Sequence, residues 1–102
     1  MSPSNCSRSL ANMQKALTET RNSLGKVTKP YHYVNEVRLL GYALHSGFKS
    51  GLELKDLTRD QMRLLRRMIC LNTQLIRAHV DYADRKQSCR QLVLDQEAKS
   101  RT

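Results

Sequence analysis

The amino-acid sequence predicts an all-α fold: a three-helix bundle, made of an antiparallel hairpin and a long third helix, with a polar C-terminal extension. Apolar residues recur at spacings of three and four along three segments, which is the period of an α-helix. Only four Gly and two Pro occur among 102 residues, too few for the many turns of an all-β sandwich. The length fits one domain, and we expect a three-helix domain over residues 1–85 and the polar extension over residues 86–102.

The first two predicted helices are bounded by specific residues. The first has an apolar stripe and then Gly25, the usual residue type just past a helix end, because glycine adopts the left-handed conformation without strain. The second begins at Pro30, whose fixed backbone suits the first helical position. Within it, Gly41 indicates a close helix–helix approach, and Gly47 and Gly51 bracket its end. The stripes are Leu10, Met13, Leu17, Thr20 and Leu24, then Val34, Val37, Gly41, Leu44 and Phe48.

The third predicted helix has the clearest start. Thr58 and Gln61 have the spacing of a capping box, and Leu57 and Met62 that of a hydrophobic staple. Apolar residues from Met62 to Ala83 cover about half of the helix circumference, which suits a helix packed against two others. Past residue 85, polar residues enter this arc, so we expect residues 86–102 either to project or to be held by another element.

Positive charge dominates the chain, with 18 Lys and Arg against 9 Asp and Glu, a net charge of +9. On the third helix, four arginines flanked by a fifth form a row opposite the apolar arc, and Asp81 and Asp84 continue it. This row is a solvated face, a contact for an acidic protein, or a contact for a phosphate backbone. No aromatic residues that stack on bases lie between its members, which are Arg59, Arg63, Arg66, Arg67 and Arg77.

Two further sets of polar residues could lie at an interface, one with a partner protein and one between helices. Tyr31 and Tyr33, at the start of the second helix, either anchor an interface or pack at the base of the hairpin. Asn72 and His79 lie seven residues apart within the apolar arc, so we expect them to form a polar pair across a helix interface.

Neither a catalytic motif nor a metal-ligand spacing occurs in the sequence, so we expect no enzyme activity, no cofactor and no metal. Cys6, Cys70 and Cys89 are an odd number without zinc spacing, a pattern that predicts no disulfide framework and indicates a reducing compartment. The apolar runs are too short for a membrane span. Residues 1–29 are basic, rich in Ser and contain one acid, Glu19, which is the composition of a mitochondrial targeting segment.

In helix order, basicity and the arginine-rich third helix, residues 7–86 resemble the LYR-motif proteins. The Leu-Tyr-Arg motif itself is absent, since the nearest stretch reads Ser9-Leu10-Ala11-Asn12, so no residue role carries over. The resemblance implies a small three-helix mitochondrial protein, of the kind that serves as an accessory subunit or assembly factor of respiratory complexes and ATP synthase.

The expected function is therefore a non-catalytic accessory or assembly subunit of a large mitochondrial complex, either respiratory-chain or ATP synthase, on the matrix side. A hydrophobic content of 39%, with one Phe and no Trp, predicts a small core that other subunits would complete. The expected partners are other protein subunits, with a position at the periphery of an inner-membrane complex left open. The alternative is a ribosomal or mitoribosomal protein that binds rRNA through the arginine row.

Overall fold

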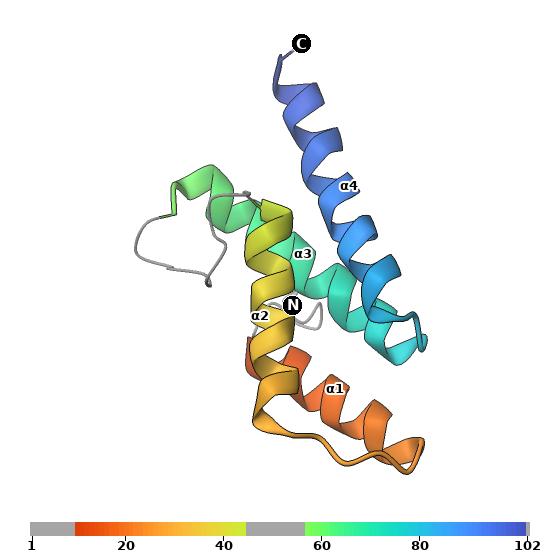
Figure 1. Ribbon diagram of the computed structural model, residues 1–102. Coiled ribbons are helices and arrows are strands. Elements are labelled where there is room, and N and C mark those ends of the chain that lie inside the picture. Colours follow the sequence, from red (N-terminus) through yellow and green to blue (C-terminus); the bar gives the residue numbers. More distant parts are fainter. Residues whose placement is uncertain (1–9, 45–56, 102) are drawn as a thin grey trace, which may run out of the picture.

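The computed structural model describes residues 10–44 and 57–101, and this part of the chain contains four α-helices and no strand (Figure 1). The helices are α1 (Leu10–Ser23), α2 (Pro30–Leu44), α3 (Arg59–Arg77) and α4 (Tyr82–Arg101). The all-α class is confirmed, but the bundle has four helices instead of three. The predictions for Cys6, Gly47, Phe48 and Gly51 lie outside the described residues.

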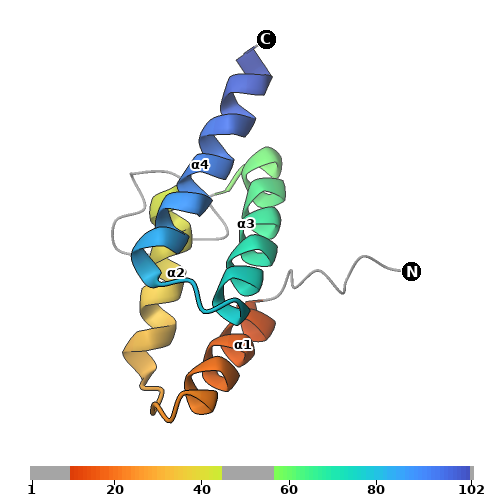
Figure 2. The same cartoon turned by 90° about the vertical axis from the view of Figure 1, so that its right-hand side faces the viewer.

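The helices pack in two layers. Helix α1 packs mainly against α3, and α2 mainly against α4 (Figure 2). Although α1 and α2 are joined by a short loop, they are not each other's main packing partner, so the predicted antiparallel hairpin is not the unit of packing. A hydrogen bond of 2.7 Å between Thr18 Oγ1 and Tyr33 Oη links them near the loop.

The predicted end of α1 and the predicted starts of α2 and α3 are confirmed. Gly25 has a φ of 73°, and the N–H of Lys26 donates to the carbonyl of Arg21 over 2.9 Å, the wide bond of a Schellman cap. Helix α2 begins at Pro30. At the start of α3, the Gln61 N–H donates to Thr58 Oγ1 over 3.1 Å and the Thr58 N–H donates to Gln61 Oε1 over 2.9 Å, which completes the capping box.

The long third helix is a wrong prediction, because the chain turns between Arg77 and Tyr82. His79 takes the left-handed conformation, with a φ of 63°, and the Val80 N–H donates to the carbonyl of Leu75 over 3.0 Å, a second Schellman cap. Asp81 then caps α4, since its Oδ1 accepts from the Asp84 N–H over 2.9 Å. The apolar period continues through this turn, and no Gly or Pro marks it.

Helix α4 belongs to the core, which corrects the predicted polar extension. Residue 86, the expected start of that extension, lies inside α4, and Cys89 and Val93 are fully buried beyond it. Only the far end of α4 extends past the other helices (Figure 1). The core around these two residues is supplied by α1, α2 and α3, and its buried members are Met13, Ala16, Leu17, Leu39, Leu40, Ala43, Leu44, Leu65, Met68, Ile69 and Ile76.

The buried face of α2 also differs from the prediction. The expected stripe included Val34, but 46% of this residue is exposed, whereas Glu36, which the stripe omitted, is 3% exposed. Gly41 and Leu44 of the expected stripe are buried, but Leu39, Leu40 and Ala43 are buried as well, and Glu36 lies on the same side of the helix as these three residues. The opposite side of α2, which carries Val34, is left on the surface.

We expect the turn between α3 and α4 to depend on the backbone of His79. A β-branched residue is strained in the left-handed conformation, so His79→Val should lower the free energy of unfolding by about 1–2 kcal/mol, whereas His79→Gly should leave it unchanged or raise it. Urea unfolding followed by circular dichroism measures both variants. A valine variant as stable as the unsubstituted protein would contradict the role of this turn.

Candidate interaction surfaces

A polar cluster lies in the core where the four helices meet. Its members are Glu36 of α2, Asn72 of α3 and Arg85 of α4, which are 3%, 0% and 6% exposed. The Arg85 guanidinium forms a bidentate pair with the Glu36 carboxylate: Nη1 contacts Oε1, and Nη2 donates to Oε2 over 3.0 Å. Because the carboxylate and the guanidinium are both removed from water, their mutual attraction offsets the cost of burying two charges.

The remaining polar atoms of this cluster are satisfied by its neighbours. Asn72 Nδ2 donates to Glu36 Oε1 over 2.9 Å and to the sulfur of Met13 over 3.3 Å, while Asn72 Oδ1 accepts from Arg85 Nη1 over 3.1 Å. Arg85 Nε donates to the Val80 carbonyl over 3.1 Å, which ties the cluster to the α3–α4 turn. A fully satisfied network of this kind fixes one arrangement of the helices.

The sequence did not reveal this cluster. The predicted pair of Asn72 with His79 is wrong, because His79 is exposed in the α3–α4 turn while Asn72 bonds to Glu36 and Arg85. One signal was present: Glu36 is the only acidic residue of α2 and lies among its apolar residues. An isolated carboxylate in such a helix needs a buried cation as its partner.

All five predicted arginines of α3 are exposed, but they do not form one row. Cys70 and Thr73, which occupy the same side of the helix between Arg66 and Arg77, are buried. Arg77 Nη1 lies 3.3 Å from Glu19 Oε1 of α1, an ion pair with both side chains about half exposed. Only Arg59, Arg63 and Arg66, with Arg67 beside them, therefore form a continuous row. Arg59, Arg63 and Arg66 have no bonded partner among the described residues. Asp81 and Asp84 do not continue it, because they belong to the start of α4.

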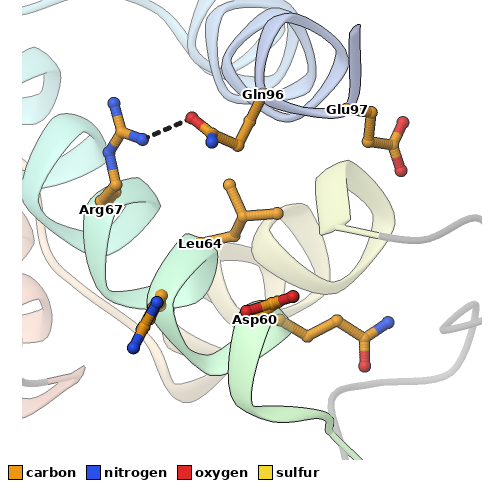
Figure 3. Close-up of a pocket in the computed structure, with 7 residues that line it drawn as sticks. Asp60, Leu64, Arg67, Gln96 and Glu97 are labelled. Carbon is orange, nitrogen blue, oxygen red and sulfur yellow. Dashed lines mark hydrogen bonds between the residues drawn. The ribbon is translucent and has the colours of Figure 1, made fainter. Parts of the chain in front are cut away.

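Arg63 and Arg67 line a pocket of about 550 Å³ between the first half of α3 and the second half of α4 (Figure 3). Arg67 Nη1 donates to Gln96 Oε1 over 2.7 Å and so joins the two helices across the pocket. The other lining residues are Asp60, Gln61 and Leu64 of α3 and Glu97 of α4. The pocket is therefore lined by two guanidinium groups, two carboxylates, two amides and one apolar side chain.

The two predicted interface tyrosines lie in different environments. Tyr31 is 59% exposed, and its ring centroid is 4.2 Å from that of His32. Tyr33 is half-buried, packs against the core and hydrogen-bonds to Thr18 of α1. Tyr31 is therefore available to a partner, whereas Tyr33 holds α1 and α2 together.

The two cysteines that the structure describes differ in their chemical state, since Cys89 is a free thiol and Cys70 is disulfide-bonded. Burial, opposed in part by the nearby Arg85 guanidinium, raises the pKa of the free Cys89 thiol to about 11, which keeps it protonated and unreactive. Cys70 is disulfide-bonded, which the predicted absence of a disulfide framework did not anticipate. In the described ranges, no cluster of three His, Cys, Asp or Glu side chains is placed to hold a metal ion.

None of the four helices is both long enough and apolar enough to cross a membrane.

Removing one partner of the buried ion pair should unfold the protein or nearly so. Arg85→Met alone leaves the Glu36 carboxylate buried and unpaired, which costs about 3–5 kcal/mol, a large part of the stability of a chain of this size. The double variant Glu36→Leu with Arg85→Met removes both charges, and we expect it to recover most of this loss. Urea unfolding of both variants tests this, and a double variant no more stable than the single one would contradict it.

The Cys89 thiol should make stability fall in alkaline solution. Its pKa is raised from 9.0 in the unfolded chain to about 11 in the folded protein, so between these values the folded state retains a proton that the unfolded state has lost. The free energy of unfolding therefore decreases as the pH rises from 9 to 11, by about 2–3 kcal/mol, and is unaffected by this group below pH 9. In Cys89→Ala this part of the decrease should be absent, and an unchanged pH dependence would contradict the assignment.

Comparison with known proteins finds no matching family model, no matching curated protein and no matching solved structure.

Proposed function

We propose that this protein is a non-catalytic accessory or assembly subunit of a large mitochondrial complex, either respiratory-chain or ATP synthase. The observation that carries the proposal is the position of its exposed apolar residues. Among the described residues, seven large hydrophobic side chains are exposed, and five of them come from one stretch between the end of α1 and the end of α2: Leu24, Val27, Tyr31, Val34 and Tyr42. Grouped exposed apolar residues are typical of a surface that another protein covers.

The composition supports the same proposal. A chain with one Phe and no Trp has few large side chains for its core, yet it places three of its four tyrosines on the surface, Tyr31, Tyr42 and Tyr82. Tyrosine is enriched in the energetically dominant part of protein interfaces. The mitochondrial location rests on the basic, acid-poor composition of residues 1–29.

The test is co-migration of the tagged full-length chain with a large complex in native gels of solubilised mitochondria. We expect Tyr31→Ser with Val34→Ser to reduce co-migration by about ten-fold or more, because buried interface anchors contribute most of the binding free energy. Leu94→Ser is the matched control, since Leu94 is 41% exposed but lies on α4, away from this stretch. A chain that migrates alone would overturn the proposal.

A second experiment on the same mitochondria tests on which side of the inner membrane the protein lies. The cysteine pattern favours the reducing matrix, whereas a disulfide persists in an oxidising compartment. We propose the matrix side, where the disulfide that Cys70 forms in the structure would be kept reduced, so thiol labelling before and after reduction should find Cys70 as a free thiol in cells. Recovery of oxidised Cys70 would instead place the protein outside the matrix.

A second candidate function is binding to rRNA in a ribosome or mitoribosome. It is favoured by Arg59, Arg63 and Arg66, which are exposed and form no bond to any described residue. It ranks below the first because α3 contains no aromatic residue to stack on bases. For this function, Arg63→Glu with Arg66→Glu should abolish salt-sensitive RNA binding, while the same charge change at Lys26 and Lys29 should weaken it far less. Affinity independent of salt would exclude it.

A further inference from the structure

The outer side of α2 presents a row of exposed residues. Tyr31, Val34, Arg38 and Tyr42 follow one another at spacings of three and four, which places them on one side of the helix. Tyr31, Val34 and Tyr42 are 59%, 46% and 45% exposed, and Arg38 is exposed between them. This is the side of α2 left free when Leu39, Leu40 and Ala43 entered the core.

The first half of α4 extends this row. Lys86 Nζ lies 4.2 Å from the centroid of the Tyr42 ring, and Tyr82 Oη donates to the Asn35 carbonyl of α2 over 3.2 Å. The Tyr82 ring is 39% exposed. Burial and the Glu36 carboxylate raise the pKa of Tyr82, while the guanidinium groups of Arg85 and Arg38 partly oppose this shift. We name the surface made of Tyr31, Val34, Arg38, Tyr42, Tyr82 and Lys86 the tyrosine face.

The charge of the tyrosine face is positive. Arg38 and Lys86 belong to it, Lys29 lies exposed at its N-terminal end, and Arg90 lies at the other, with Nη1 donating to the Ala43 carbonyl over 3.1 Å. The only carboxylate of α2, Glu36, is buried and paired with Arg85, so it does not offset these charges at the surface. A complementary partner has to be acidic.

The spacing of the row indicates the shape of the partner. Tyr31 and Tyr42 are eleven residues apart on α2, which corresponds to about 16 Å, or three helical turns. Apolar side chains at intervals of three and four along a straight helix form a ridge that fits beside a second helix. Arg38 interrupts the apolar row at its centre, which suits a protein partner with an acid there better than the acyl region of a membrane.

We infer that the tyrosine face docks an acidic amphipathic α-helix of a partner protein, about three turns long, with apolar residues toward Tyr31, Val34 and Tyr42 and an Asp or Glu opposite Arg38. This inference rests on the proposed function and adds the chemistry and the secondary structure of the partner. Tyrosine and arginine are the residue types that most often dominate the binding free energy of an interface.

Site-specific photo-crosslinking in intact mitochondria tests it. A photoreactive phenylalanine analogue replaces Tyr31 or Tyr42 in the full-length chain, and the control position is Gln87, which is exposed on α4 outside the tyrosine face. We expect positions 31 and 42 to cross-link to one helical segment of one protein, rich in Asp and Glu, and position 87 not to reach that segment. Arg38→Glu should lower the cross-linking yield by about ten-fold or more through like-charge repulsion, whereas Arg38→Lys should largely retain it.

Circular dichroism melts of these variants establish that each remains folded. Adducts to lipid, to RNA or to a segment without acidic residues would overturn the inference, and so would the absence of any adduct from positions 31 and 42. If the chain co-migrates with a large complex but gives no such adduct, the inference fails and the proposed function stands. If the chain migrates alone, the proposed function fails, and the inference fails with it.

Discussion

The bidentate pair between Arg85 and Glu36 is the interaction on which the rest of the fold depends. Of the described side chains of α4, only Arg85, Cys89 and Val93 are buried, so this helix contributes little apolar surface to the core. Its position is set instead by Arg85, which reaches α2 through Glu36, α3 through Asn72 and the α3–α4 turn through the Val80 carbonyl. In a small protein with few large apolar residues, this polar network fixes the position of α4, which the hydrophobic effect alone would leave loosely specified.

The same pair determines what the surface of α2 offers. Because Glu36 turns inward to meet Arg85, Leu39, Leu40 and Ala43 face the core, and the tyrosine face turns outward. The internal network and the exposed aromatic row are therefore two sides of one helix orientation. A chain that oriented α2 by its predicted stripe would bury Val34 and expose the carboxylate, and it would lose both features.

Local chemistry made part of this fold predictable from sequence. The caps at Gly25 and Thr58 and the start at Pro30 depend on residues within a few positions of each other, and all three are confirmed. The turn at His79 escaped prediction because residues other than glycine seldom take the left-handed conformation, and the apolar pattern continues through the turn. The polar cluster escaped because its members are far apart in the chain and each alone is indistinguishable from a surface residue.

For the exposed surfaces, the sequence predicted which types of residue take part better than it predicted where these residues lie. The five arginines placed opposite the apolar arc of α3 are exposed, but their row is divided by the packing of α1 on α3. For the two tyrosines the sequence left both an interface and packing open, and the structure separates them: Tyr31 is exposed and Tyr33 is half-buried. Tyr42, Tyr82 and Arg38 were not anticipated, because their grouping requires α4 to lie beside α2. That arrangement follows from the buried pair and not from any periodicity.

The buried cluster also has a consequence for tracing this protein's ancestry. Glu36, Asn72 and Arg85 are separated by 36 and 13 residues, and a change at one of them is tolerated only with a compensating change at another. Such a triplet should be retained as a unit while the surrounding apolar positions exchange among Leu, Ile, Val and Met. Distant homologues would then be recognised by a Glu, an Asn and an Arg in this order on the second, third and fourth helices, even where overall identity has faded.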